Sequence, residues 1–256
     1  MRASNEVSVT VWGEGDPAVL IHGSFGWGSE TWEKQRPLGD SYRLLLVDRR
    51  GFGTSAANGP VDFERDASDI SDLLDEPAHL VGQSYGGVVA LLTAARSSER
   101  VRSLTVIEPP AFGLVRGDPA VEQFIAGVEE AVRAATDPSD YRLRFLRSFG
   151  FSAEREELSG RNLDAATSSW RERPPWEAEI PLDLLAAAPF PKLVVRGDWS
   201  TVSRRARDLG GRALHAVCDM LERRLDAEAA VFPAAHNPQL LGEPFNERLC
   251  TFWETT

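Results

Sequence analysis

The sequence has little cysteine and no long apolar run. Cys218 and Cys250 are its only cysteines in 256 residues. This is far from the disulfide framework of a small secreted domain, so reduced thiols and a cytoplasmic location are expected, although the two could form one disulfide. No stretch approaches the ~20 apolar residues of a membrane-spanning helix, and residues 1–7 lack the apolar run of a signal peptide. We therefore expect no membrane partner.

Basic residues are also in the minority. The 28 lysines and arginines against 39 acidic residues give a formal net charge of −11. Such a surface repels nucleic acid, so no nucleic-acid partner is expected. The sequence also lacks a metal-ligand cluster, a dinucleotide fingerprint and a phosphate-binding loop, which predicts no metal and no cofactor. With 42% hydrophobic residues, the composition is that of a globular protein with a large core.

Short apolar runs alternate with helical patterns along most of the chain. The runs are compact, as in strands buried on both faces, except that the first alternates with period two like an edge strand. This alternation predicts an α/β sheet covered by helices on both faces. The runs are residues 7–12, 18–21, 42–47, 78–81, 104–107, 192–195 and 229–232, and the helix candidates are 63–74, 86–95, 202–209, 213–225 and 244–253.

One long interval, residues 111–189, contains helical patterns but no convincing strand. Loops of this length are rare inside compact domains, so the interval is interpreted as a helical cap inserted between two core strands. The core is then formed by residues 1–110 and 190–256.

The strongest chemical signal is Gly-x-Ser-x-Gly at residues 82–86, with Ser84 at its centre and a further glycine at position 87. It follows a predicted strand and opens a predicted helix, the context that makes this motif a nucleophile site. The turn exposes the serine hydroxyl, and the amide of Tyr85 points from the helix N-terminus to the same space. The sequence therefore predicts Ser84 as a nucleophile.

A second signal is the strand that runs into a glycine-rich loop at residues 19–26. Acyl transfer needs a second donor for the developing oxyanion, and a backbone amide of this loop can supply it. We assign this role to Ser24, which a change of register could move by one residue. His22 is interpreted as a structural residue that holds the loop by hydrogen bonds.

The general base is predicted to be His236. It lies in a loop after the last predicted strand and before the final helix, where it can reach Ser84. His79 falls within a strand and His215 within a helix, so both are interpreted as packing or surface residues.

The order of the motifs along the chain resembles the α/β-hydrolase fold superfamily. These motifs are His22-Gly23, a loop that begins at Asp48 and contains Arg-Gly-Phe-Gly, the Ser84 motif and the late His236. The resemblance covers about residues 7–253. It implies an eight-stranded, mostly parallel sheet with a helical cap, and a Ser–acid–His triad that contains Ser84 and His236. The Asp48 loop resembles a structural loop near the pocket mouth, and cap helices of this fold often mediate dimers, so a homodimer could form.

The acid departs from the usual family pattern. Relatives commonly carry an aspartate three residues after the glycine that ends the penultimate core strand. Here that glycine is Gly197 and the expected position holds Ser200, while Asp198 comes two residues early. Some members resemble a different arrangement, with a glutamate after the strand that follows the nucleophile helix. Glu108 has this place, with two prolines behind it that restrict the backbone. We favour Glu108 and keep Asp198 as the alternative.

These residues predict acyl transfer with an acyl-enzyme intermediate that water hydrolyses. A serine nucleophile disfavours dehalogenation and epoxide hydrolysis, which use an aspartate in this fold. Aromatic residues around the site favour an uncharged hydrophobic ester or lactone as substrate. A C–C bond hydrolase, a thioesterase, a lyase and a catalytically silent ligand-binding pseudo-hydrolase stay open as alternatives. The candidate pocket residues are Phe25, Trp27, Tyr85, Phe112, Trp170, Trp176 and Trp199.

Overall fold

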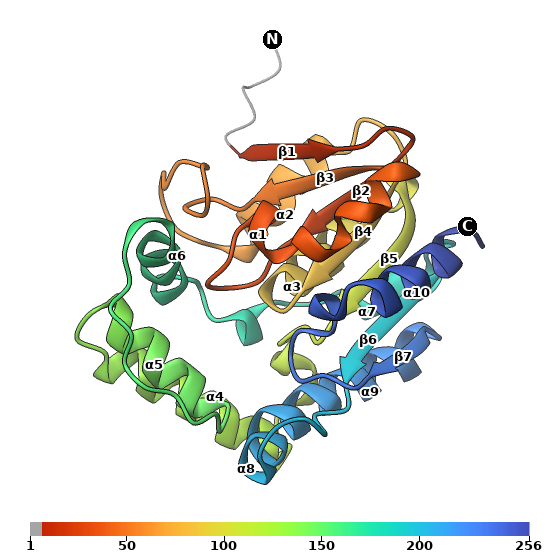
Figure 1. Ribbon diagram of the computed structural model, residues 1–256. Coiled ribbons are helices and arrows are strands. Elements are labelled where there is room, and N and C mark those ends of the chain that lie inside the picture. The colour runs from red at the N-terminus through yellow and green to blue at the C-terminus, as the bar shows by residue number, and fades with distance from the viewer. Residues whose placement is uncertain (1–6, 256) are drawn as a thin grey trace.

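The computed structural model describes residues 7–255, and its strands form a single sheet (Figure 1). Their order across the sheet is β1-β3-β2-β4-β5-β6-β7. β1 is antiparallel to β3, and every other neighbouring pair is parallel. The strands are β1 (Ser8–Trp12), β2 (Asp16–Ile21), β3 (Tyr42–Asp48), β4 (Ala78–Gln83), β5 (Val101–Ile107), β6 (Lys192–Gly197) and β7 (Glu228–Phe232).

The described part of the chain has seven strands, so the expected number of eight is wrong. The eighth strand was implied by the family resemblance alone. The sequence itself contains seven apolar runs, and each overlaps one of the seven strands. Within residues 7–255, β1 is the antiparallel edge strand and no strand precedes it.

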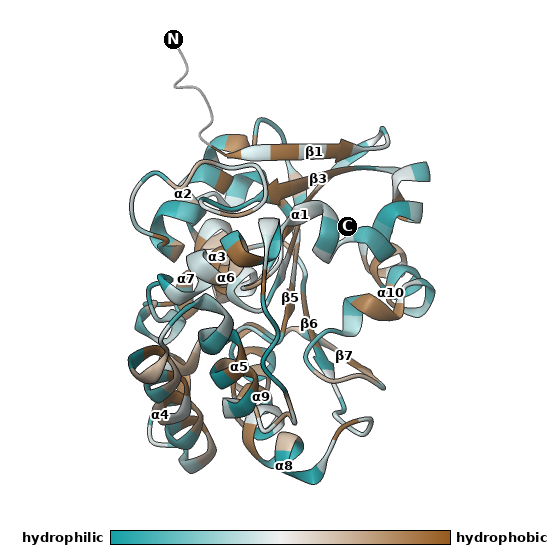
Figure 2. Ribbon diagram, turned by 60° about the vertical axis from the view of Figure 1, so that its left-hand side comes forward, coloured by the Kyte–Doolittle hydropathy of each residue, from teal (hydrophilic) through white to brown (hydrophobic). Residues whose placement is uncertain are grey.

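Successive side chains of β2 point into two different hydrophobic layers, because a strand alternates its faces. Val19 and Ile21 belong to a hydrophobic cluster that includes residues of α2 (Phe63–Leu73), α3 (Tyr85–Arg96) and α9 (Arg212–Leu225). Ala18 and Leu20 belong to a second cluster, with residues of α10 (Glu243–Trp253) and with Trp32 and Leu38. The sheet is therefore covered on both faces, which explains why its strands are apolar throughout. In Figure 2 β3 is largely brown, whereas teal residues gather on the helices.

The helices of the two layers connect the strands, except for η6 and α10, which follow β7. The longer ones are α2 (Phe63–Leu73), α3 (Tyr85–Arg96), α9 (Arg212–Leu225) and α10 (Glu243–Trp253), and the shorter ones are α1 (Gly28–Thr31), η1 (Glu33–Asp40), η2 (Ser98–Arg100), α8 (Arg204–Ala206), the π-helical turn η5 (Arg207–Gly211) and η6 (Pro238–Leu241). None of the helices in residues 7–255 is long and apolar enough to cross a membrane.

The cap segment, as we call residues 111–189, holds η3 (Phe112–Val115), α4 (Pro119–Ala134), α5 (Pro138–Ser148), α6 (Gly160–Trp170), η4 (Pro175–Glu177) and α7 (Leu182–Ala187). Asp-Pro pairs start α4 and α5. Asp118 and Asp137 accept hydrogen bonds from amides of the first turn. The proline that follows each of them lacks an N–H at a position where an N–H would have no acceptor within the helix. α4, α5 and α6 lie to one side of the sheet, on the left in Figure 1. The division into core and cap stays a prediction.

Candidate active site

Ser84 occupies the sharp turn between β4 and α3. Its backbone angles, φ 52° and ψ −123°, are strained for a residue with a side chain. A Cβ at Gly82 would lie 2.3 Å from the carbonyl oxygen of Gly86, so only glycine fits where strand and helix cross. The turn places the Ser84 hydroxyl at the end of the central strand.

Two further side chains, which follow the ends of β5 and β7, form a chain of hydrogen bonds with Ser84. The Ser84 Oγ lies 2.9 Å from Nε2 of His236, in the loop after β7. The Nδ1 of the same ring lies 2.8 Å from Oε2 of Glu108, the first residue after β5. The structure thus places Ser84, His236 and Glu108 in one chain of hydrogen bonds.

Glu108 is fully buried, and its backbone φ is positive, at 41°. Its Oε1 accepts hydrogen bonds from the Gly197 amide at 2.9 Å and from the Trp199 indole Nε1 at 2.8 Å. With the His236 ring on Oε2, three donors replace the water that the carboxylate loses on burial. Glu108 is therefore fixed with one oxygen directed at the imidazole.

Asp198, the alternative acid, has a different environment. It is exposed, and its Oδ1 accepts hydrogen bonds from the backbone amide and the hydroxyl of Ser200, both at 2.8 Å. These two bonds lower the pKa of the Asp198 carboxyl. Of the two candidates, Glu108 is the one that contacts His236.

Two backbone amides border Ser84. Tyr85 is the first residue of α3, so its N–H has no acceptor within the helix. On the other side, the loop after β2 passes very close to the nucleophile. A Cβ at Gly23 would lie 2.8 Å from Cβ of Ser84, and Ser24 follows directly. Ser24 and Tyr85 both line the same cavity as Ser84 and His236.

Two cavities meet at Ser84. The first is predominantly apolar and extends under the cap segment, and the second is more polar. Ser24, Ser84, Phe145, Phe149 and His236 line both. The first is completed by side chains that include Phe112, Phe124, Val128, Tyr141, Trp176 and Leu214, and the second by Phe25, Gln83, Arg142, Phe151 and Asn237, among others.

The predicted aromatic residues divide into two groups. Phe25, Tyr85, Phe112 and Trp176 line a cavity at Ser84. Trp27, Trp170 and Trp199 are in neither cavity, so the expectation that they line the pocket is wrong. The Trp170 indole instead donates to the Val132 carbonyl oxygen at 3.1 Å, and its ring stacks on Tyr141.

Trp199 is 1% exposed, because its indole donates to Glu108 and its ring stacks on Phe149 and Phe151. Trp27 packs instead against a small cluster formed by Phe52, Val61 and Ala165.

The sequence reasoning missed three aromatic residues, two in α5 and one directly after it. Tyr141, Phe145 and Phe149 are spaced by four residues, the spacing that places side chains on one face of a helix. All three line the first cavity. This spacing could have identified them, whereas the sequence does not show which element of the core the helix faces.

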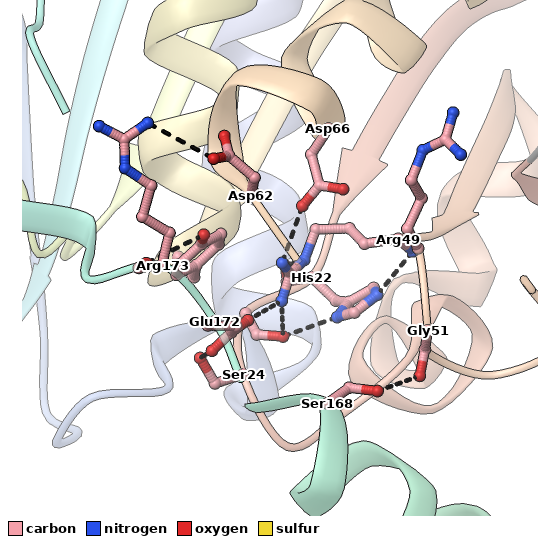
Figure 3. A network of polar contacts seen from close by, with 12 residues as sticks. His22, Ser24, Arg49, Gly51, Asp62, Asp66, Ser168, Glu172 and Arg173 are labelled. Atoms are coloured by element: carbon pink, nitrogen blue, oxygen red, sulfur yellow. Dashed lines mark hydrogen bonds and ion pairs between the residues drawn. The ribbon is translucent and has the colours of Figure 1, made fainter. Parts of the chain in front are cut away.

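A buried polar network lies beside the site and joins the core to the cap segment (Figure 3). The Arg49 guanidinium forms ion pairs with Asp66 at 3.0 Å and with Glu172 at 2.6 Å. Burial raises the pKa of both carboxyl groups, against the opposing effect of Arg49. Burial also lowers the pKa of His22, whose ring nitrogens contact the Gly23 carbonyl and the Arg49 amide. His22 thus has the structural role expected for it, and Glu172 was not foreseen.

Comparison with known proteins agrees with this geometry. A model of the alpha/beta hydrolase family matches residues 18–248. The chain belongs to this family. It is similar to a pimeloyl-(acyl-carrier protein) methyl ester esterase of Aeromonas hydrophila, with 31% identity over 186 residues that cover 71% of this chain and 68% of that protein. The corresponding esterase of Aliivibrio fischeri is 36% identical over 107 residues, 41% of each chain.

Among solved structures, an esterase from Exiguobacterium antarcticum superimposes with a TM-score of 0.69 over 97% of this chain and 95% of that one. The two sequences are 22% identical, so this likeness establishes the fold.

Proposed function

We propose that this α/β hydrolase cleaves a carboxylic ester or lactone of a hydrophobic small molecule through an acyl-enzyme on Ser84. The observation that carries the proposal is the hydrogen-bond chain from Ser84 through His236 to Glu108, at the junction of two cavities. This is the geometry that activates a serine hydroxyl, in which the base is held by a third group.

In the proposed reaction, His236 Nε2 takes the Ser84 proton while Oγ attacks the substrate carbonyl carbon. The carbonyl oxygen then carries a negative charge, which the amides of Tyr85 and Ser24 would stabilise. As the intermediate collapses, His236 returns the proton to the leaving alkoxide. Water, deprotonated by His236, then attacks the acyl carbon. As the bond to Ser84 Oγ breaks and the acid is released, His236 returns the proton to Oγ. Glu108 would hold the imidazole tautomer and stabilise its cationic form.

The cavities support the substrate class. An ester carries an acyl group on one side of its carbonyl carbon and an alkoxy group on the other. Ser84 lines two cavities, so each cavity could hold one of these two groups. The larger number of apolar rings lies in the first cavity, which therefore suits a hydrophobic arm. The esterase relatives support ester hydrolysis as the type of reaction. The completed hydrogen-bond chain argues against a silent pseudo-hydrolase.

The test is release of nitrophenol from nitrophenyl esters of short and medium acyl chains. We expect turnover by the wild type, none above background by Ser84→Ala, and wild-type rates for Ser200→Ala, a matched change on an exposed serine outside both cavities. A fluorophosphonate should label Ser84. A folded wild type that hydrolyses no ester or lactone and is not labelled would overturn the proposal.

A further inference from the structure

The loop that carries the Ser24 amide is held by side chains from two different parts of the fold (Figure 3). From the core, Arg49 Nη2 donates to the Gly23 carbonyl oxygen at 3.1 Å. From the cap segment, Glu172 Oε2 accepts a hydrogen bond from the Ser24 hydroxyl at 2.5 Å, and Ser169 Oγ accepts one from the Phe25 amide at 2.8 Å. Three consecutive residues of the loop are therefore anchored.

The anchor on Gly23 fixes the direction of the Ser24 amide. A peptide unit is planar and trans, so the carbonyl of Gly23 and the N–H of Ser24 point in opposite directions. His22 adds a second donor to this carbonyl. Its Nε2 accepts the Arg49 amide at 3.0 Å, so Nδ1 carries the proton and donates to Gly23 at 2.7 Å. With its carbonyl turned toward Arg49 and His22, the peptide unit presents its N–H on the opposite side.

Glu172 connects the two anchors. Its Oε1 accepts from Arg49 Nη2 at 2.6 Å while its Oε2 accepts from Ser24. The side chain is 7% exposed and that of Arg49 is fully buried. A displacement of Glu172 would therefore release both the Ser24 hydroxyl and one contact of the guanidinium that holds the Gly23 carbonyl.

The charges in this network indicate that Glu172 does more than balance Arg49. Asp66 already forms a buried ion pair with Arg49 at 3.0 Å. One carboxylate suffices to neutralise the guanidinium, and burial of a second acidic group beside it is unfavourable, which its raised pKa reflects. Glu172 is thus not needed for neutrality, and its contacts are directed at the loop next to Ser84.

From these contacts we infer that Glu172 is a positioning residue of the cap segment, which holds the Ser24 amide in the orientation that binds the oxyanion. The inference rests on the proposed function. Glu172 would thereby couple the cap segment to the chemical step, because the Ser24 amide has this orientation only when the segment after α6 contacts the loop.

The test compares Glu172→Gln and Glu172→Met with Glu177→Gln and Glu177→Met. Glu177 is an exposed carboxylate in the same segment that pairs with Arg173 and lies outside both cavities. The readouts are the rate of Ser84 labelling by a fluorophosphonate, kcat and KM for a nitrophenyl ester, and the inhibition constant of a trifluoromethyl ketone, whose adduct places an oxyanion at the site.

For Glu172→Met we expect labelling and kcat to fall about 10-fold to 100-fold, since loss of a whole oxyanion donor costs roughly 100-fold to 1000-fold. KM should stay within about threefold, and the inhibition constant should rise in parallel with the fall in kcat/KM. Glu172→Gln retains an acceptor for Ser24 and should recover part of the rate. The Glu177 variants should match the wild type.

If the wild type is labelled but folded Glu172→Met reacts at the wild-type rate, the inference is wrong and the proposed function stands. A fall in kcat of Glu172→Met without a change in the inhibition constant of the ketone would also overturn the inference. A partly unfolded enzyme would behave in that way, because its remaining folded molecules would bind the ketone normally. A wild type that resists the fluorophosphonate refutes the proposed function and this inference with it.

Discussion

The Trp199 indole is expected to contribute both to stability and to catalysis through one hydrogen bond. Trp199 Nε1 donates to Glu108 Oε1, and the ring stacks on Phe149 and Phe151. The substitution Trp199→Phe keeps an aromatic ring in this stack but removes the N–H. The buried carboxylate then retains the Gly197 amide and the His236 ring as donors.

The magnitude follows from burial. A hydrogen bond to a buried charged group contributes about 1.5–3 kcal/mol. The smaller ring leaves a gap that costs about 1 kcal/mol more. A loss of about 3 kcal/mol in the free energy of unfolding lowers Tm by about 6–12 °C in a protein of this size. Because Oε2 of Glu108 still faces His236, we expect kcat to fall only about 10-fold.

Thermal unfolding and nitrophenyl ester kinetics measure the two effects. Trp27→Phe is the matched control, since Trp27 is partly buried in a separate small cluster, and it should change Tm by only a few degrees and leave kcat unaltered. If Trp199→Phe has the Tm and kcat of the wild type, the indole–carboxylate bond contributes nothing and the account of Glu108 positioning fails.

Two other predictions concern the core. Gly82→Ala should abolish activity and lower the folded yield, because its Cβ would meet the Gly86 carbonyl at 2.3 Å; near-normal kcat with an unchanged circular dichroism spectrum would contradict this. His79 is buried, and desolvation lowers its pKa from 6.5 to about 4 in the folded protein. Between these pH values the unfolded chain binds a proton that the folded protein does not, so stability should fall as the pH falls through this window. His79→Gln should therefore lose less stability than the wild type between pH 7 and pH 5, as judged by the urea midpoint, and an equal loss in both proteins would refute this role of His79.

Much of the fold could be predicted because parallel strands are buried on both faces and therefore leave unbroken apolar runs. Six of the seven strands overlap such runs, and the antiparallel edge strand β1 overlaps the run that alternates with period two. The eighth strand, implied by resemblance alone, has no run in the sequence and is absent from the described residues.

The positions of the candidate site residues at the strand ends could also be predicted from the sequence. Ser84 follows β4, Glu108 follows β5 and His236 lies in the loop after β7, so the sheet itself brings them to one edge. The choice between Glu108 and Asp198 depended on side-chain direction, which strand position alone does not give.

The cap segment was predicted less well, because helical periodicity shows which face of a helix is apolar but not what that face packs against. Outside the cap segment, the sequence likewise did not show whether Trp199 lines a pocket or donates a hydrogen bond to the acid. Glu172 carries no local motif, and its partners Ser24 and Arg49 are more than 120 residues away in the chain. A homodimer stays a prediction.

We propose that Glu108 orients the His236 imidazole and stabilises its cationic form during the reaction. The direct test is kcat for a nitrophenyl ester in Glu108→Gln and Asp198→Asn, with folding checked for both. We predict that Glu108→Gln lowers kcat by about 10³-fold to 10⁴-fold, the order of loss when a triad acid becomes an amide, and that Asp198→Asn stays within about twofold of the wild type. A large loss of kcat in Asp198→Asn, together with a kcat near that of the wild type in Glu108→Gln, would contradict this role of Glu108.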